Sequence, residues 1–119
     1  MSRRSRELRL EANERWPNLC QFLGGHLHQD WPIHSGSPEK AVEHAVAEWD
    51  LAGRRSVLVE WRDWNQIRGC RPDVTTSMND ELGVDVFFET DLEARQFMNM
   101  VYDKLITSVR AETSKDWKP

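Results

Sequence analysis

The sequence predicts an all-α fold, a small bundle of four to five helices joined by short connections. Apolar residues recur with the period of an α-helix over most of the chain, and Gly and Pro residues divide it into helical segments. Only residues 84–88 alternate as a strand does, and one short strand without a partner is unstable. We therefore expect residues 84–88 to be an extended connector held against a helical core.

The chain of 119 residues has the length of one domain. We expect a charged N-terminal arm over residues 1–16, frayed or helical only where it docks. A single all-helical domain should follow over residues 17–112, and residues 113–119 should form a loose C-terminal tail.

The first secure helix is expected from residue 17 to residue 29 or 30. Pro17 suits the first turn, where its missing N–H is not needed, and Pro32 stops the helix. Its apolar stripe consists of Leu19, Phe22, Leu23 and Leu27.

Later helices have equally clear starts. Ser37 and Pro38 are an N-cap and a first helical residue, and the helix that they open should end near Gly53. A third helix is expected over 54–68 and a short helical turn over 77–82. Thr90 and Glu93 form a capping box that opens the last and strongest helix.

Charge and composition narrow the function classes. The net charge is −4, the pI is about 5.5 and the mean hydropathy is −0.72. This balance argues against nucleic acid and anionic membranes as partners and suits a basic protein. The start of the chain lacks the apolar region of a signal peptide, and no segment has the apolar length of a membrane span. We expect a cytoplasmic protein in which Cys20 and Cys70 are reduced thiols.

The most suggestive cluster for chemistry is the group of His26, His28, His34 and Asp30. On a helix His26 and His28 point about 200° apart, so they cannot share a metal ion. Structural zinc needs four converging ligands and catalytic zinc three, and this segment supplies at most two. We therefore predict no metal site and no cofactor.

His26 and Asp30 form an i, i+4 pair on the apolar face of the first helix. One interpretation is an acid–base dyad of a hydrolase, and the other is a lock on the turn that leads to the next helix. In the second, Asp30 accepts from His26 or from backbone N–H groups of residues 36–39. Because no Ser or Cys nucleophile lies nearby, we favour the lock and predict no catalytic residue.

Two further surfaces can be read as binding sites. The helix over 54–71 interleaves Arg residues with Trp61 and Trp64, which suggests a small nucleic-acid-associated protein as an alternative function. The acidic net charge counts against that alternative.

The second surface is a run between Arg71 and Arg95 that contains no Lys or Arg. Such a run is either a solvated face or a docking surface for a basic protein, with Phe87 and Phe88 as anchors. Its seven acids are Asp73, Asp80, Glu81, Asp85, Glu89, Asp91 and Glu93.

The segment PNLCQFLGGHLHQDW, followed by GSPEKAVEHAV, resembles the start of the CdiI immunity proteins of bacterial contact-dependent growth inhibition systems. The similarity is specific over residues 17–46, and His26 stands where that family has an aromatic residue. Its matching positions are Leu19, Phe22, Gly25, His28, Gln29, Asp30, Trp31, Gly36, Ser37, Glu39, Ala41 and Val42.

This resemblance implies a cytoplasmic protein that is not an enzyme. It would bind and block the cognate C-terminal toxin domain of a CdiA-type exoprotein, in many cases a nuclease and therefore basic. The motif residues His28, Gln29, Asp30, Trp31, Gly36 and Ser37 would define the fold. We expect the toxin-binding residues in the acidic run, at Asp80, Glu81, Asp85, Phe87, Glu89, Asp91 and Glu93.

Overall fold

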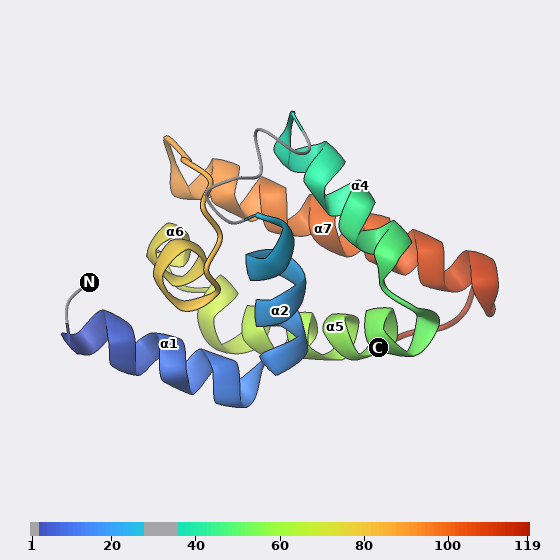
Figure 1. Ribbon diagram of the computed structural model, residues 1–119, viewed down its shortest axis with the longest axis horizontal. Coiled ribbons are helices and arrows are strands. Elements are labelled where there is room, and N and C mark those ends of the chain that lie inside the picture. The colour runs from blue at the N-terminus through green and yellow to red at the C-terminus, as the bar shows by residue number, and fades with distance from the viewer. Residues whose placement is uncertain (1–2, 28–35) are drawn as a thin grey trace.

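A computed structural model describes residues 3–27 and 36–119, and it is all-α over these residues, as the sequence predicts. Figure 1 shows the elements in order. They are α1 (Arg3–Arg15), α2 (Pro17–His26), α4 (Pro38–Glu48), α5 (Leu51–Trp64), the π-helical turn η1 (Asn65–Gly69), α6 (Val74–Thr76), the π-helical turn η2 (Ser77–Glu81) and α7 (Asp91–Glu112).

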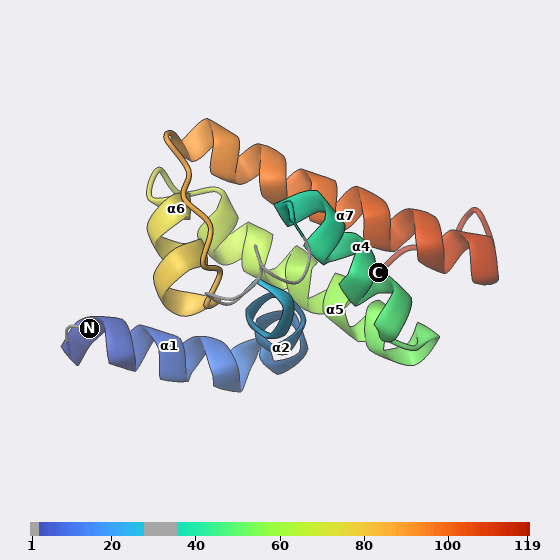
Figure 2. The ribbon, with the colours of Figure 1, turned by 45° about the horizontal axis from the view of Figure 1, so that its top comes forward.

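The core lies where α5 packs against α2 on one side and α7 on the other, with α4 resting on α2 and α7. Figure 2 shows α5 between α1 and α7, with α6 at the end where α5 gives way to η1. The apolar stripe expected on the first helix is buried, with Leu19 and Leu23 at 0% exposure. The largest fully buried side chains include Trp16, Trp64, Phe22, Leu58, Met78 and Leu105.

A buried arginine joins α5 to α7. Arg54 is 6% exposed and donates to Trp49 O at 3.0 Å, Ser108 Oγ at 3.0 Å and Glu112 Oε2 at 2.7 Å. Each of these bonds satisfies a polar group that would otherwise be desolvated without a partner. Arg54 therefore has a structural role in this helix pair.

The boundary between the second and third predicted helices is wrong by about one turn. The second helix, α4, ends at Glu48, and Gly53 lies inside α5. The reason is Asp50, whose Oδ1 accepts from Gly53 N at 2.7 Å and so caps α5. The prediction placed the end of the second helix at Gly53 and did not include the Asp50 cap.

Both chain ends lie against the rest of the protein. Residues 3–15, expected as an arm, form α1, with Ala12 1% exposed and Arg9 Nε donating to Asp80 O at 3.1 Å. In the segment expected as a loose tail, the Trp117 ring lies 5.8 Å from the Arg55 guanidinium, and Pro119 O accepts from Arg62 at 2.8 Å. None of the described helices combines the length and apolarity that a membrane crossing requires.

Candidate functional site

The part of the acidic run from Asp80 to Glu93 forms the end of η2, the connector over residues 82–90 and the start of α7. Figure 1 shows this connector in orange, running from beside α6 to α7. Residues 84–88 are extended and pair with no strand in the described chain, which confirms the expected connector. Gly83, with φ of +72°, makes the turn out of η2 that a residue with a side chain would strain to adopt.

The connector backbone is held from both sides. Asn79 Nδ2 donates to Val84 O at 2.7 Å and to Val86 O at 3.1 Å. From the other side, Asp85 N donates to Leu27 O at 2.7 Å. The segment is therefore preformed. Asn79, which no sequence pattern marks, fixes it on one side.

The two phenylalanines of the connector have opposite roles. Phe88 packs inward on Phe97, with ring centroids 5.5 Å apart, whereas Phe87 is 85% exposed. An aromatic ring held at the surface on a fixed backbone can serve as a binding anchor, because aromatic side chains are enriched among the residues that dominate interface energies.

Phe87 forms a ridge between two open grooves. The α2 groove, of about 980 Å³, lies between α1, α2 and the connector, and its lining includes Arg9, Cys20, Gly24, Asn79, Leu82 and Val84. The α7 groove, of about 490 Å³, lies between the first turns of α4 and α7, and its lining includes Pro38, Glu39, Val86, Glu93, Phe97 and Met100. A partner that covered Phe87 would meet both grooves.

The acids of the run differ in what they do. Asp85 and Glu89 are exposed and Asp80 is half-buried. Asp91 Oδ1 accepts from Thr75 N at 3.1 Å and Thr75 Oγ1 at 2.6 Å, and these bonds lower the pKa of the Asp91 carboxyl. Glu93 Oε2 accepts from Glu89 N at 3.0 Å, so both carboxylates also fix the start of α7.

Glu81 does not belong to this surface. It is 4% exposed, its Oε1 lies 3.2 Å from Arg68 Nε, and its Oε2 accepts a hydrogen bond from Ser77 Oγ. A carboxylate buried in this way is tied to its partners and presents no charge to a second protein. We therefore remove Glu81 from the expected toxin-binding set.

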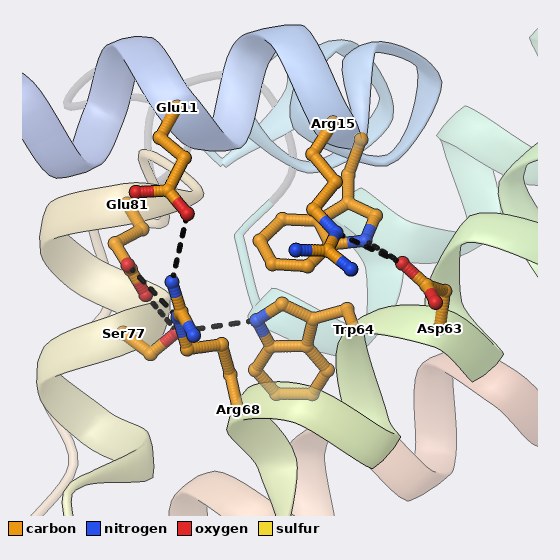
Figure 3. Close-up of polar contacts among 8 residues, drawn as sticks. Glu11, Arg15, Asp63, Trp64, Arg68, Ser77 and Glu81 are labelled. Atoms are coloured by element: carbon orange, nitrogen blue, oxygen red, sulfur yellow. Dashed lines mark hydrogen bonds and ion pairs between the residues drawn. The ribbon is translucent and has the colours of Figure 1, made fainter.

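The bonds of Glu81 extend into a polar network that joins four elements, α1, α5, η1 and η2. Figure 3 shows Arg68 of η1 between Glu11 of α1 and Glu81 of η2, with an Arg68–Glu11 distance of 3.3 Å. Trp64 Nε1 donates to Ser77 Oγ at 3.1 Å. This network sets where η2 ends and hence where the connector begins.

Three members of the histidine cluster, His28, Asp30 and His34, lie outside the described residues, as do the motif residues Gln29 and Trp31. The expected His26–Asp30 pair therefore also lies outside them. His26 joins α2 to α4, because its Nε2 lies 2.7 Å from Glu48 Oε2 of α4. Its Nδ1 lies 3.2 Å from Phe22 O within α2.

The motif residues that follow serve the start of α4. Gly36 has φ of +83°, a conformation that favours glycine. Ser37 Oγ accepts from Lys40 N at 3.2 Å, as the sequence predicts for an N-cap.

The tryptophans of the helix over 54–71 point into the core. Trp61 and Trp64 are 7% and 1% exposed, and Trp61 Nε1 donates to Met98 O at 3.1 Å. Neither ring can stack on a base, because each is buried. This arrangement removes the main support for the nucleic-acid alternative.

The described residues contain no group of three or more His, Cys, Asp or Glu side chains arranged to hold a metal ion. Both cysteines are free thiols. Burial, aided by the negative charge of Glu60, raises the pKa of the Cys20 thiol to about 11, which disfavours the reactive thiolate.

Comparison with protein families gives a match that includes the motif after residue 17. The model of the family described as CdiI immunity protein matches residues 15–105. The corresponding comparisons with curated proteins and with solved structures gave no match. Because the family model covers most of the chain, this protein belongs to the CdiI immunity protein family and is an immunity protein of a contact-dependent growth inhibition system.

Proposed function

We propose that this protein binds and neutralises the cognate C-terminal toxin domain of a CdiA-type exoprotein through one preformed acidic surface. This surface, the connector face, consists of Asp80, Asp85, Phe87, Glu89, Asp91 and Glu93. The toxin would be a basic nuclease met in the cytoplasm, and binding would occlude its active site or its substrate-binding surface. The protein itself would catalyse nothing.

The observation that carries this proposal is Phe87, 85% exposed on a connector that Asn79 holds from within. A preformed aromatic anchor loses little conformational entropy on binding, and anchors of this kind dominate interface energies. The acids around it supply negative charge without a Lys or Arg between Arg71 and Arg95. Complementary charge of this kind raises the association rate with a basic partner.

The first test is co-purification of the chain with the toxin domain encoded immediately upstream, together with inhibition of that toxin's activity. An interface of ordinary size, about 800 Å² on each partner, should survive purification. Failure of the wild-type chain to bind or inhibit that domain would contradict the proposal.

Two substitutions locate the interface. Phe87→Ala should weaken toxin binding by about 30-fold or more, as the loss of a central anchor does. Glu89→Lys should lower the association rate and flatten its dependence on salt concentration. The Glu89 side chain is exposed, and the bond that Glu89 makes to Glu93 comes from its backbone N–H, so the substitution keeps that bond.

Asp103→Lys is the matched control for Glu89→Lys. Asp103 is an exposed acid of α7, roughly 18 Å along the helix from Asp91 at 1.5 Å per residue, and its reversal changes the net charge by the same amount. We expect near wild-type association for this control. Equal losses for the two variants would mean that total charge, and not the connector face, drives binding.

A further inference from the structure

We propose that the α7 groove receives one arginine or lysine side chain of the toxin domain. The aliphatic stem would lie on the apolar floor of the groove, and the charged end would lie between Glu39 and Glu93. This inference rests on the proposed function, because it names what the connector face would recognise.

The floor of the groove is apolar and comes from separate elements. Val86 belongs to the connector, Phe97 and Met100 to α7, and Pro38 to the first turn of α4. Phe97 is held from one side by the Phe88 ring at 5.5 Å. Long cationic side chains lie with their methylene groups on such surfaces while the charged end stays at the edge.

The charges that line the groove are all negative. Glu39 and Glu93 contribute carboxylates, and no described Lys or Arg lines the groove. Glu93 is held by its bond from Glu89 N at 3.0 Å, and Glu39 sits in the first turn of α4, whose start Gly36 and Ser37 fix. Two carboxylates on separate fixed helix starts favour one cation and disfavour an anionic or a purely apolar occupant.

This groove also gives the shared motif a second use. Residues 37–39 not only begin α4 but also form one wall of the groove beside the Phe87 ridge. The wall supplied by the family motif would then be common to relatives, whereas the connector wall would carry the choice of toxin.

The test is the double variant Glu39→Gln with Glu93→Gln, titrated against the toxin domain encoded immediately upstream in an inactivated form. Glutamine keeps the acceptor that Glu89 N needs but removes both charges. We expect the dissociation constant to rise about tenfold or more. The matched control is Glu14→Gln with Asp103→Asn, which neutralises two exposed acids outside the groove and should bind within about twofold of wild type.

The occupant is identified by replacing each arginine and lysine of the toxin domain with methionine, which keeps the apolar stem. One replacement should weaken binding to the wild-type chain by about tenfold and have little effect on the double variant, as expected for directly coupled groups. If no replacement shows this coupling, or if the double variant binds like its control, the inference is overturned.

These outcomes are distinct from failure of the proposed function. A double variant that binds normally, beside a Phe87→Ala variant that binds weakly, rejects the groove occupant and keeps the connector face. Absence of binding by the wild-type chain rejects both. Urea unfolding of each variant shows whether a lost affinity reflects a lost fold.

Discussion

Glu81 is one of seven acids between Arg71 and Arg95, yet it is 4% exposed and its carboxylate lies 3.2 Å from Arg68. From the sequence alone, Glu81 and Glu89 are equally expected at the surface, because a run of charged residues does not show which side chains point inward. The difference arises from the π-helical turn η2, which directs Ser77 and Glu81 toward Arg68 and Trp64. The sequence predicts a short helical turn over 77–82, but it does not predict the π-helical geometry that turns Glu81 inward.

Glu81→Ala should therefore destabilise the fold, although it lies in a run that looks like a solvated surface. Among the described residues, the substitution leaves the Arg68 guanidinium, 14% exposed, with the more exposed Glu11 as its remaining ionic partner. Breaking a buried pair from one side costs about 3 kcal/mol of the free energy of unfolding. Urea unfolding measures this, and Glu89→Ala is the control, with an expected change within about 0.5 kcal/mol. Equal midpoints for the two variants would contradict the role given to the network.

Cys20 predicts a pH dependence of stability. Burial raises the pKa of its thiol from 9.0 to about 11. Between these two pH values the unfolded chain has lost the thiol proton while the folded chain still holds it. The free energy of unfolding therefore falls as pH rises, by up to about 1.4 kcal/mol per pH unit, and the contribution is complete only below pH 9.

The measurement is urea unfolding of the wild type and of Cys20→Ala at several pH values from 8 to 11. The other groups that titrate in this range are common to both chains, so the difference between them reports the thiol. Cys20→Ala should lack this part of the slope, and Cys70→Ala, at an exposed thiol, should follow the wild-type curve. A Cys20→Ala curve that ran parallel to wild type would rule out the buried thiol as the source.

At the scale of elements, the starts of α4 and α7 and the extended connector were predictable, whereas the boundary between α4 and α5 was not. The capping-box pattern of Thr90 and Glu93 predicts the start of α7, and Thr90 Oγ1 accepts from Glu93 N at 3.1 Å. The end of the second helix was misplaced because Gly53 looked like a terminator, whereas a glycine inside a helix costs only about 1 kcal/mol and Asp50 offsets it with a cap.

The connector is the element on which the candidate site depends, and Asn79 is its main internal support. Asn79→Ala should free the carbonyl groups of Val84 and Val86, which now accept at 2.7 and 3.1 Å. We expect a loss of about 1–3 kcal/mol in the free energy of unfolding and faster amide hydrogen exchange in residues 84–88. Toxin affinity should fall too, because Phe87 would have to be ordered on binding.

Asn99→Ala is the matched control for Asn79→Ala. Asn99 is an exposed amide side chain of α7, away from the connector. It should leave exchange in residues 84–88 as in wild type. Unchanged exchange in the Asn79 variant as well would show that the connector is held by its own packing and by the Asp85–Leu27 bond.

At the scale of the whole molecule, the family match begins at residue 15, so all of α1 except its last residue is outside it. The sequence predicted a charged arm there, because Leu8 and Leu10 are its only large apolar residues after Met1. The helix is held chiefly by contacts that the sequence cannot pair, such as Arg9 with Asp80 O at 3.1 Å and Glu11 with Arg68 at 3.3 Å. Polar pairs between residues this far apart in the chain leave no local pattern in the sequence from which they could be predicted.

Removal of residues 1–14 tests whether the part of the chain that the family model matches folds without α1. The truncated chain keeps Trp16, which is 1% exposed and donates to Asp63 Oδ2 at 2.8 Å, so it should still unfold cooperatively. It loses the Ala12 contact and the polar bonds of Arg9 and Glu11, a loss of about 2–4 kcal/mol in the free energy of unfolding. Urea unfolding checks this value.

Toxin affinity of the same truncated chain then tests where the interface lies. Residues 1–14 hold four arginines and three glutamates, so their removal changes the net charge from −4 to −5 and slightly favours a basic partner. If binding depends on Phe87 and the α7 groove, affinity should stay within about threefold of wild type. A loss above tenfold in a chain that still folds would instead extend the interface across the α2 groove to α1, which lines it through Arg9 and Asn13.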